Sequence, residues 1–157
     1  MARRFWLMKV ESAVFSIHDL KKAGSTSWDG VRNYQARNSM RDDFQVGDGV
    51  LFYHSSSDPS GVAGLAVVSR AGYPDATAFK KGHEYFDPKS KKDAPTWFTV
   101  DVKFEQAFAH TITLETLKAT PGLEQMLVTR RGQRLSVMPV TEAEYRIVCD
   151  LARKAQG

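Results

Sequence analysis

The sequence has one cysteine, no long apolar run and few histidines, and each shortage narrows the possibilities. A single cysteine, Cys149, cannot form an internal disulfide, which favours a reducing compartment. The longest apolar runs, such as residues 65–68, are far shorter than the roughly 20 residues that a membrane-spanning helix needs. No apolar segment follows the basic start, so we expect no signal peptide. These features predict a soluble, cytoplasmic protein with no membrane partner.

Residue patterns typical of catalytic and metal sites are also scarce. His54 and Ser55 are adjacent in a predicted strand, so their side chains diverge and cannot form a nucleophile–base pair. No glycine-rich phosphate loop follows a strand. The histidines show none of the spacings that gather metal ligands, at positions His18, His54, His83 and His110. We therefore expect a protein that is not an enzyme and that holds neither a cofactor nor a metal.

The positive charge is concentrated in three segments. The net charge of the 157-residue chain is +4, yet residues 30–41, 80–92 and 126–134 each carry a net charge of +3. The rest of the chain is therefore acidic. Clustered basic residues are typical of a surface that binds phosphates. For residues 80–92 alone, lysines that merely keep the protein soluble explain the charge equally well.

Apolar alternation predicts strands at residues 5–11, 50–54, 63–70, 96–108 and 134–140. The 50–54 strand is apolar on both faces, which favours a central position. Short helices are predicted at residues 16–23, 35–43 and 113–119. A capping box, Thr141 to Glu144, starts a final helix whose Ile147 and Leu151 should pack on the sheet. Consecutive strands with peripheral helices predict a single α+β domain over residues 1–157, built on an antiparallel or mixed barrel.

The stretch from Trp28 to Ser56 is the most informative part of the chain. It opens with a large aromatic residue and a glycine turn, and residues 31–38 then hold two arginines, two asparagines, a glutamine and a tyrosine. So many hydrogen-bonding groups beside a flat ring suit recognition of a polar, planar molecule. A solvated loop and short helix explain the same residues equally well.

Several words of the sequence resemble the EVE domain family. They are FWLMKVE at residues 5–11, WDGVRNYQARN at 28–38, GD at 47–48, FYHS at 52–55, YFDPKS at 85–90 and RLSV-PV at 134–140. The family pattern has a proline where this chain has Ser12, directly after Glu11. The resemblance implies a compact PUA-like mixed barrel with peripheral helices. It also implies non-catalytic binding of modified nucleobases in DNA or RNA.

The matching motif positions imply a binding site for the base, and the three basic segments predict a surface for the nucleic-acid backbone. Trp28 is expected to be the stacking wall, with Trp6 a weaker candidate because strand alternation assigns it to the core. The polar residues expected to read the base are Lys9, Glu11, Asn33 and Ser55, with Arg37 and His54 as further candidates. The backbone is expected to contact basic residues, namely Arg32, Arg41, Lys80, Lys81, Arg130, Arg131 and Arg134.

The expected partner is thus a nucleic acid that carries a modified base, such as methylated or hydroxymethylated cytosine or methylated adenine. We expect the protein to act as a monomer. Three alternatives stay open from the sequence. They are a binder of modified tRNA or rRNA, a sensor of free small ligands, and a hydrolase built on the same barrel.

Overall fold

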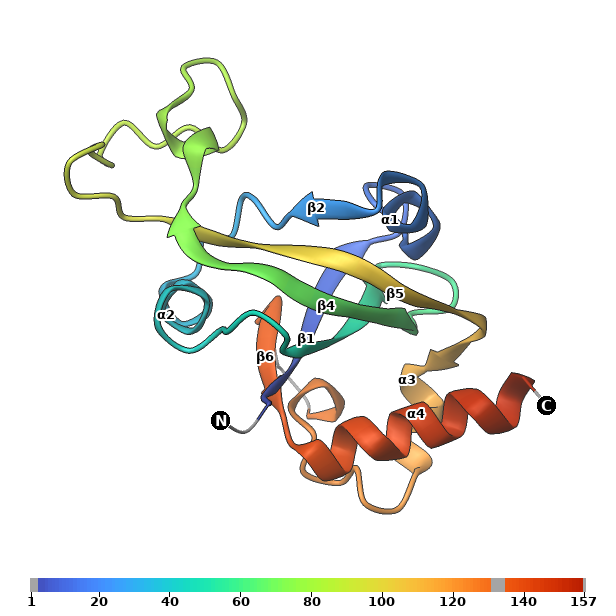
Figure 1. Ribbon diagram of the computed structural model, residues 1–157. Coiled ribbons are helices and arrows are strands. Elements are labelled where there is room, and N and C mark those ends of the chain that lie inside the picture. The colour runs from blue at the N-terminus through green and yellow to red at the C-terminus, as the bar shows by residue number, and fades with distance from the viewer. Residues whose placement is uncertain (1–2, 131–134, 157) are drawn as a thin grey trace.

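The computed structural model describes residues 3–130 and 135–156 (Figure 1). The strands are β1 (Phe5–Glu11), β2 (Ser25–Ser27), β3 (Gly49–Ser55), β4 (Gly61–Pro74), β5 (Phe98–Thr113) and β6 (Val137–Val140). The helices are α1 (Ile17–Ala23), α2 (Tyr34–Asp42), α3 (Leu114–Ala119) and α4 (Glu142–Gln156), with short 3₁₀ turns η1 (Ala76–Phe79) and η2 (Leu127–Thr129). No helix within the described ranges is long and apolar enough to cross a membrane.

The six strands form one mixed sheet in the order β2-β5-β4-β3-β1-β6. Strand β1 pairs in parallel with β3, whereas the other neighbours are antiparallel. The α+β class and the PUA-like architecture are confirmed, and β3 occupies the central position that its apolar faces predicted. The sheet ends at β2 and β6 and is strongly curved, but it does not close into a complete barrel.

Local capping signals fix the ends of the helices. Ser16 accepts the amide of Asp19, whose carboxylate accepts the amide of Ser16, so a capping box starts the helix predicted at residues 16–23. Gly24 ends this helix with a φ of 82°, a conformation that glycine adopts without strain. The same reciprocal pair joins Thr141 and Glu144 at the start of α4. These helix starts were therefore readable from the sequence.

Both faces of the sheet are covered by apolar side chains. In β1, Phe5 and Leu7 pack on one side with α3 and α4, whereas Trp6 and Met8 pack on the other side with α1 and α2. Alternation along the strand explains this division. Figure 1 shows α4 lying across one end of the sheet, far from the loop that leaves the end of β4.

The buried face of α4 differs from the predicted one by one residue in register. Val148 is fully buried, together with Tyr145 and Ala152, whereas Ile147 and Leu151 are only partly buried at the edge of the contact. The prediction that this helix docks on the sheet is thus confirmed, but its central residues are corrected. A 3.6-residue period leaves neighbouring apolar stripes nearly equivalent when both contain aliphatic residues.

We predict that Val148→Ala lowers the free energy of unfolding by about 2 kcal/mol, because it removes buried methyl groups and leaves a small cavity. Arg146→Ala, on the exposed side of the same helix, is the matched control and should cost less than about 0.5 kcal/mol. Urea denaturation measures both. Equal effects would mean that α4 is not docked as described.

Candidate functional site

A cavity of about 460 Å³ opens where the end of β1, strand β2 and the following turn meet. Its volume lies within the range of about 300–1,000 Å³ that is typical of small-molecule pockets. The lining combines aromatic, aliphatic and polar side chains. The residues are Lys9, Val10, Val14, Phe15, Thr26, Ser27, Trp28, Asp29, Gly30, Val31, Arg32, Tyr85 and Ser136.

One buried carboxylate holds the turn that forms a wall of this cavity. Asp75 is completely buried and accepts the amide of Gly30 at 2.8 Å. The same oxygen accepts a hydrogen bond from Arg32 at 3.1 Å. Its second oxygen accepts the amide and the hydroxyl of Thr77, at 2.9 and 2.5 Å. Asp75 therefore fastens the 28–32 turn to the segment that follows β4.

These contacts keep Asp75 ionised. Burial alone would raise the pKa of Asp75, but the hydrogen bonds from Gly30, Thr77 and Arg32 outweigh it, so its pKa lies below the usual value. Arg32 completes the arrangement by donating to the carbonyl oxygen of Tyr85 at 2.6 Å. The 28–32 turn, the loop that contains Tyr85 and the start of the segment after β4 are thereby joined at one point.

Gly30 allows the ring of Tyr85 to approach the turn closely. It has a φ of 85°, and a Cβ atom there would lie 2.4 Å from the Tyr85 ring. A larger residue would thus push Tyr85 out of the cavity lining and strain the backbone. The glycine after Trp28 and Asp29 is required by packing as well as by turn geometry.

Trp28 borders the cavity and is also part of the core. Its side chain is 8% exposed and meets Phe52 edge-on, with ring centroids 5.5 Å apart. Trp28 therefore supplies an aromatic side chain to the cavity lining, and its role as a stacking wall stays a prediction. Lys9 reaches the same cavity, with its ammonium 5.7 Å from the centroid of Tyr53. Burial lowers the pKa of Lys9.

Several polar groups are linked at the β2 side of the cavity. Ser27 Oγ donates to a carboxylate oxygen of Asp29 at 2.5 Å. The Tyr73 hydroxyl contacts Ser27 at 3.1 Å and also hydrogen-bonds Asp101. Burial, followed by the hydrogen bond to Asp101, raises the pKa of Tyr73, so its hydroxyl stays protonated. This network fixes the orientation of Ser27 and Asp29.

Two of the predicted base-reading residues have structural roles outside the cavity lining. Asn33 is the N-cap of α2 and accepts the amide of Ala36 at 3.0 Å. Arg37 donates to the carbonyl oxygen of Thr96 at 2.7 Å, which ties α2 to the long loop. Both arginines of the 31–38 run thus donate to acceptors within the protein.

The end of β3 also lies outside the lining. His54 Nε2 accepts the amide of Ile17 at 3.1 Å and so caps the start of α1. Burial and the nearby His18 lower the pKa of His54, which keeps its imidazole neutral and able to accept. Glu11 and Ser55 are paired in register at the ends of β1 and β3, and Glu11 is exposed.

Two further predictions concern residues near the start of the chain. Trp6 is core, as strand alternation indicated. Its indole stacks on Phe44 with centroids 4.1 Å apart and donates to Asp48 at 3.0 Å. Trp6 is therefore corrected from binding candidate to structural residue. Ser12, which replaces the family proline, hydrogen-bonds Ser57 at 2.7 Å and links the loops after β1 and β3.

The basic residues predicted to contact a nucleic-acid backbone fall into four groups. Arg32 is a correction, because its guanidinium is occupied by internal acceptors beside the cavity. Arg41 is exposed but paired with Asp42 at 2.8 Å. Lys80, Lys81 and Arg130 are exposed, whereas Arg131 and Arg134 lie outside the described residues.

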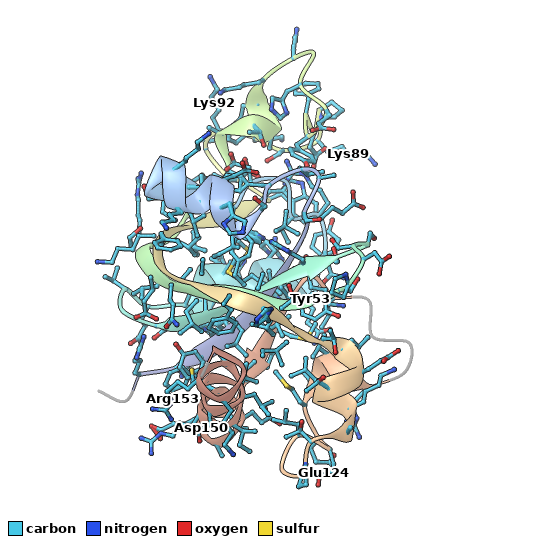
Figure 2. All side chains as sticks on the ribbon, turned by 90° about the vertical axis from the view of Figure 1, so that its right-hand side faces the viewer. Tyr53, Lys89, Lys92, Glu124, Asp150 and Arg153 are labelled. Atoms are coloured by element: carbon cyan, nitrogen blue, oxygen red, sulfur yellow. The ribbon has the colours of Figure 1, made fainter. Side chains whose placement is uncertain are left out.

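The long loop that carries the lysines is fastened near the cavity. Trp97 donates to Asp87 at 2.6 Å and stacks on Tyr34, with ring centroids 5.0 Å apart. The loop projects beyond the sheet in Figure 1, and Figure 2 shows its Lys89 and Lys92 at the end of the molecule opposite Asp150 of α4. The loop that carries these lysines also supplies Tyr85 to the cavity lining.

Sequence reasoning missed several lining residues, among them Val14, Phe15, Thr26, Ser27, Asp29, Tyr85 and Ser136. Two signals were available. Asp29 lies directly beside Trp28, and Val14 and Phe15 are apolar residues in the short segment between β1 and α1. The contributions of Tyr85 and Ser136 depend on contacts distant in the chain and carry no local pattern.

We predict that Asp75→Asn lowers the free energy of unfolding by about 2–3 kcal/mol at neutral pH, because it removes the charge that accepts from Arg32 and the turn. The folded-state pKa of Asp75 is lowered, so this stabilisation is complete above the unfolded pKa of about 3.9 and is lost as the pH falls through the lower folded value.

Urea denaturation over a pH series measures the difference. Wild type and variant should converge as the pH is lowered below about 4. Asp93→Asn, an exposed change in the same loop, is the control and should cause no such gap. A difference that stays constant down to low pH would contradict the role of the ionised carboxylate.

Comparison with known proteins identifies relatives over almost the whole chain. The model of the EVE domain matches residues 4–151. Human thymocyte nuclear protein 1 is 41% identical across 95% of this chain and 74% of its own length. A hypothetical protein from Leishmania major is 46% identical, with a TM-score of 0.94 and coverage of 99% of this chain and 98% of that one. The human THYN1 protein in complex with DNA containing 5-methylcytosine is 42% identical, with a TM-score of 0.84 and coverage of 95% and 97%. This chain belongs to the EVE domain family.

Proposed function

We propose that the protein is a non-catalytic nucleic-acid-binding module that takes up a single modified base in the cavity beside Trp28. The observation that carries the proposal is the human THYN1 complex with 5-methylcytosine DNA, from a relative 42% identical over 95% of this chain. A modified cytosine is therefore the first ligand to test. Methylated adenine and hydroxymethylated cytosine remain within the proposal.

The lining of the cavity supports this function. A base inside a duplex hides its edge, so a reader of single bases must extrude it or meet it unpaired, which costs a few kcal/mol. Stacking on an aromatic ring returns about 1–3 kcal/mol, so polar contacts must supply the remainder. The cavity offers both, with Trp28 as the aromatic wall and Lys9, Ser27 and Asp29 as polar groups.

The apolar part of the lining suits a methyl group. Val10, Val14 and Phe15 line the cavity together. Burying one methyl contributes about 0.8 kcal/mol, which is roughly a fourfold gain in affinity. A methyl-dependent preference of that modest size is expected, and the much larger share of affinity comes from the base itself and the backbone.

We predict that wild-type protein prefers a modified base within a panel of oligonucleotides that differ at one position. Trp28→Phe should reduce both the affinity and the preference for the modified base, because it shrinks the surface that holds the base beside the apolar lining. Trp6→Phe is the matched control, since this tryptophan is buried in the core outside the cavity. It should lower stability without changing the preference.

Fluorescence anisotropy at one salt concentration measures these affinities, and thermal melting confirms that each variant is folded. A panel in RNA and competition by free nucleosides test the RNA-binding and free-ligand alternatives. Recovery of chemically unchanged oligonucleotide after long incubation tests the non-catalytic proposal. Equal effects of Trp28→Phe and Trp6→Phe on the preference would contradict the cavity as the binding site.

We also predict that affinity falls linearly with the logarithm of salt concentration, because basic side chains displace counterions from phosphates. The double change Lys80→Ala/Lys81→Ala should reduce this slope by about 1–2, with similar loss for every base. Arg153→Ala in α4 is the control. Figure 2 shows Arg153 at the opposite end of the molecule from Lys89 and Lys92, which lie in the same loop as Lys80 and Lys81. A slope unchanged by the double substitution would remove this loop from the binding surface.

A further inference from the structure

The cavity contains two opposite charges that do not pair with each other. Lys9 and Asp29 both line it, yet no ion pair joins them in the described part of the chain. Ser27 donates to one oxygen of Asp29, and within the described ranges no protein donor contacts the other. The Lys9 ammonium lies near the ring of Tyr53, and none of the described residues accepts a hydrogen bond from it. Among the described residues, an oxygen of Asp29 and the N–H donors of Lys9 are thus left available at the cavity.

An acceptor of this kind has a cost in a nucleic-acid-binding protein. A carboxylate repels phosphates, and an ionised carboxylate can only accept hydrogen bonds. Asp29 is nevertheless fixed at the cavity by Ser27, which is itself held by Tyr73. Asp29 is exposed and borders the cavity. An acceptor oriented in this way at a cavity wall is suited to a ligand that carries an N–H donor.

Nucleobases divide into two classes by this criterion. Cytosine and adenine carry an exocyclic amino group, which donates, next to a ring nitrogen that accepts. Thymine, uracil and guanine carry a carbonyl oxygen, which accepts, next to a ring N–H that donates. A carboxylate beside an ammonium matches the first arrangement and opposes the second at both positions.

Building on the proposed function, we propose that Asp29 and Lys9 make the cavity selective for an amino-bearing base, cytosine or adenine, against keto bases. The Asp29 carboxylate accepts from the exocyclic amino group, and the Lys9 ammonium donates to the neighbouring ring nitrogen. Selectivity at this edge is separate from the contact of a methyl group with Val10, Val14 and Phe15. Asp29 is therefore a specificity-determining residue, and its contribution cannot be measured from the preference for a methyl group.

Four pyrimidines separate the two effects. Cytosine and 5-methylcytosine differ only by the methyl group, as do uracil and thymine. Thymine and 5-methylcytosine share the methyl group and differ at the edge that Asp29 would read. Each base is placed at the same position of a single-stranded oligonucleotide, so that duplex stability does not contribute to the comparison.

Wild-type protein should bind the 5-methylcytosine oligonucleotide about 5- to 150-fold more tightly than the thymine one, as expected for a pair of hydrogen bonds that discriminates by about 1–3 kcal/mol. Asp29→Asn retains an oxygen for Ser27 but replaces the free acceptor by an amide that can donate. It should lower the 5-methylcytosine-to-thymine ratio by about fivefold or more, while the effect of the methyl group is preserved.

The four affinities distinguish the failure of this assignment from the failure of the proposed function. Equal binding of 5-methylcytosine and thymine, or a ratio unchanged by Asp29→Asn, overturns the role of Asp29. A methyl effect that persists in that case leaves modified-base binding intact. An edge preference without any methyl effect would support the role of Asp29 and contradict a preference for the methylated base. If Asp29→Asn does not fold by thermal melting, Lys9→Met serves instead, and an unchanged ratio in that folded variant overturns the assignment.

Discussion

The buried carboxylate of Asp75 is the interaction on which the geometry of the cavity depends. It joins the turn after β2 to the segment after β4, two parts of the chain that are more than 40 residues apart. Removal of a buried ion-pair partner leaves the other charge poorly compensated, so such a contact tolerates little change. Arg32 extends the connection to the carbonyl of Tyr85, and Gly30 leaves room for its ring. The positions of Trp28, Asp29 and Tyr85 around one cavity follow from this arrangement.

The same arrangement divides the conspicuous polar residues into two sets. Asn33, Arg37 and Arg32 satisfy helix ends and loop carbonyls within the protein. Lys9 and Asp29 keep free hydrogen-bonding capacity at the cavity. The two arginines of the polar run and Asn33 thus help to build the site, whereas Lys9 and Asp29, which come from different elements, are available to a ligand. This division explains how a small, open cavity can be both rigid and polar.

The sequence was sufficient for features that depend on local chemistry. Capping boxes at Ser16 and Thr141, the glycine that ends α1 and the core position of Trp6 were all predictable, because each depends on residues a few positions away or on strand alternation. The family resemblance supplied the PUA-like architecture and Trp28. It did not indicate that the sheet stays open between β2 and β6.

Features that depend on distant partners could not be predicted. His54 looked like a ligand-binding residue, yet its acceptor nitrogen caps a helix 37 positions earlier in the chain. Arg32 looked like a phosphate contact until its three internal acceptors were located. The register of α4 was uncertain by one residue because adjacent stripes are both apolar. For His54 and Arg32, the missing information was that their polar groups already had partners within the protein.

The three tryptophans provide the most direct measurement of where the base binds. Their indole N–H groups give separate NMR signals, and Trp6 and Trp97 donate to Asp48 and Asp87 within the protein. A short oligonucleotide with one 5-methylcytosine is titrated into ¹⁵N-labelled protein, and Trp28→Phe assigns the signal of the cavity. Occupation of the cavity predicts that the Trp28 signal shifts by far the most and saturates with the binding curve. A saturating titration in which the Trp28 signal stays in place would contradict binding of the base beside Trp28.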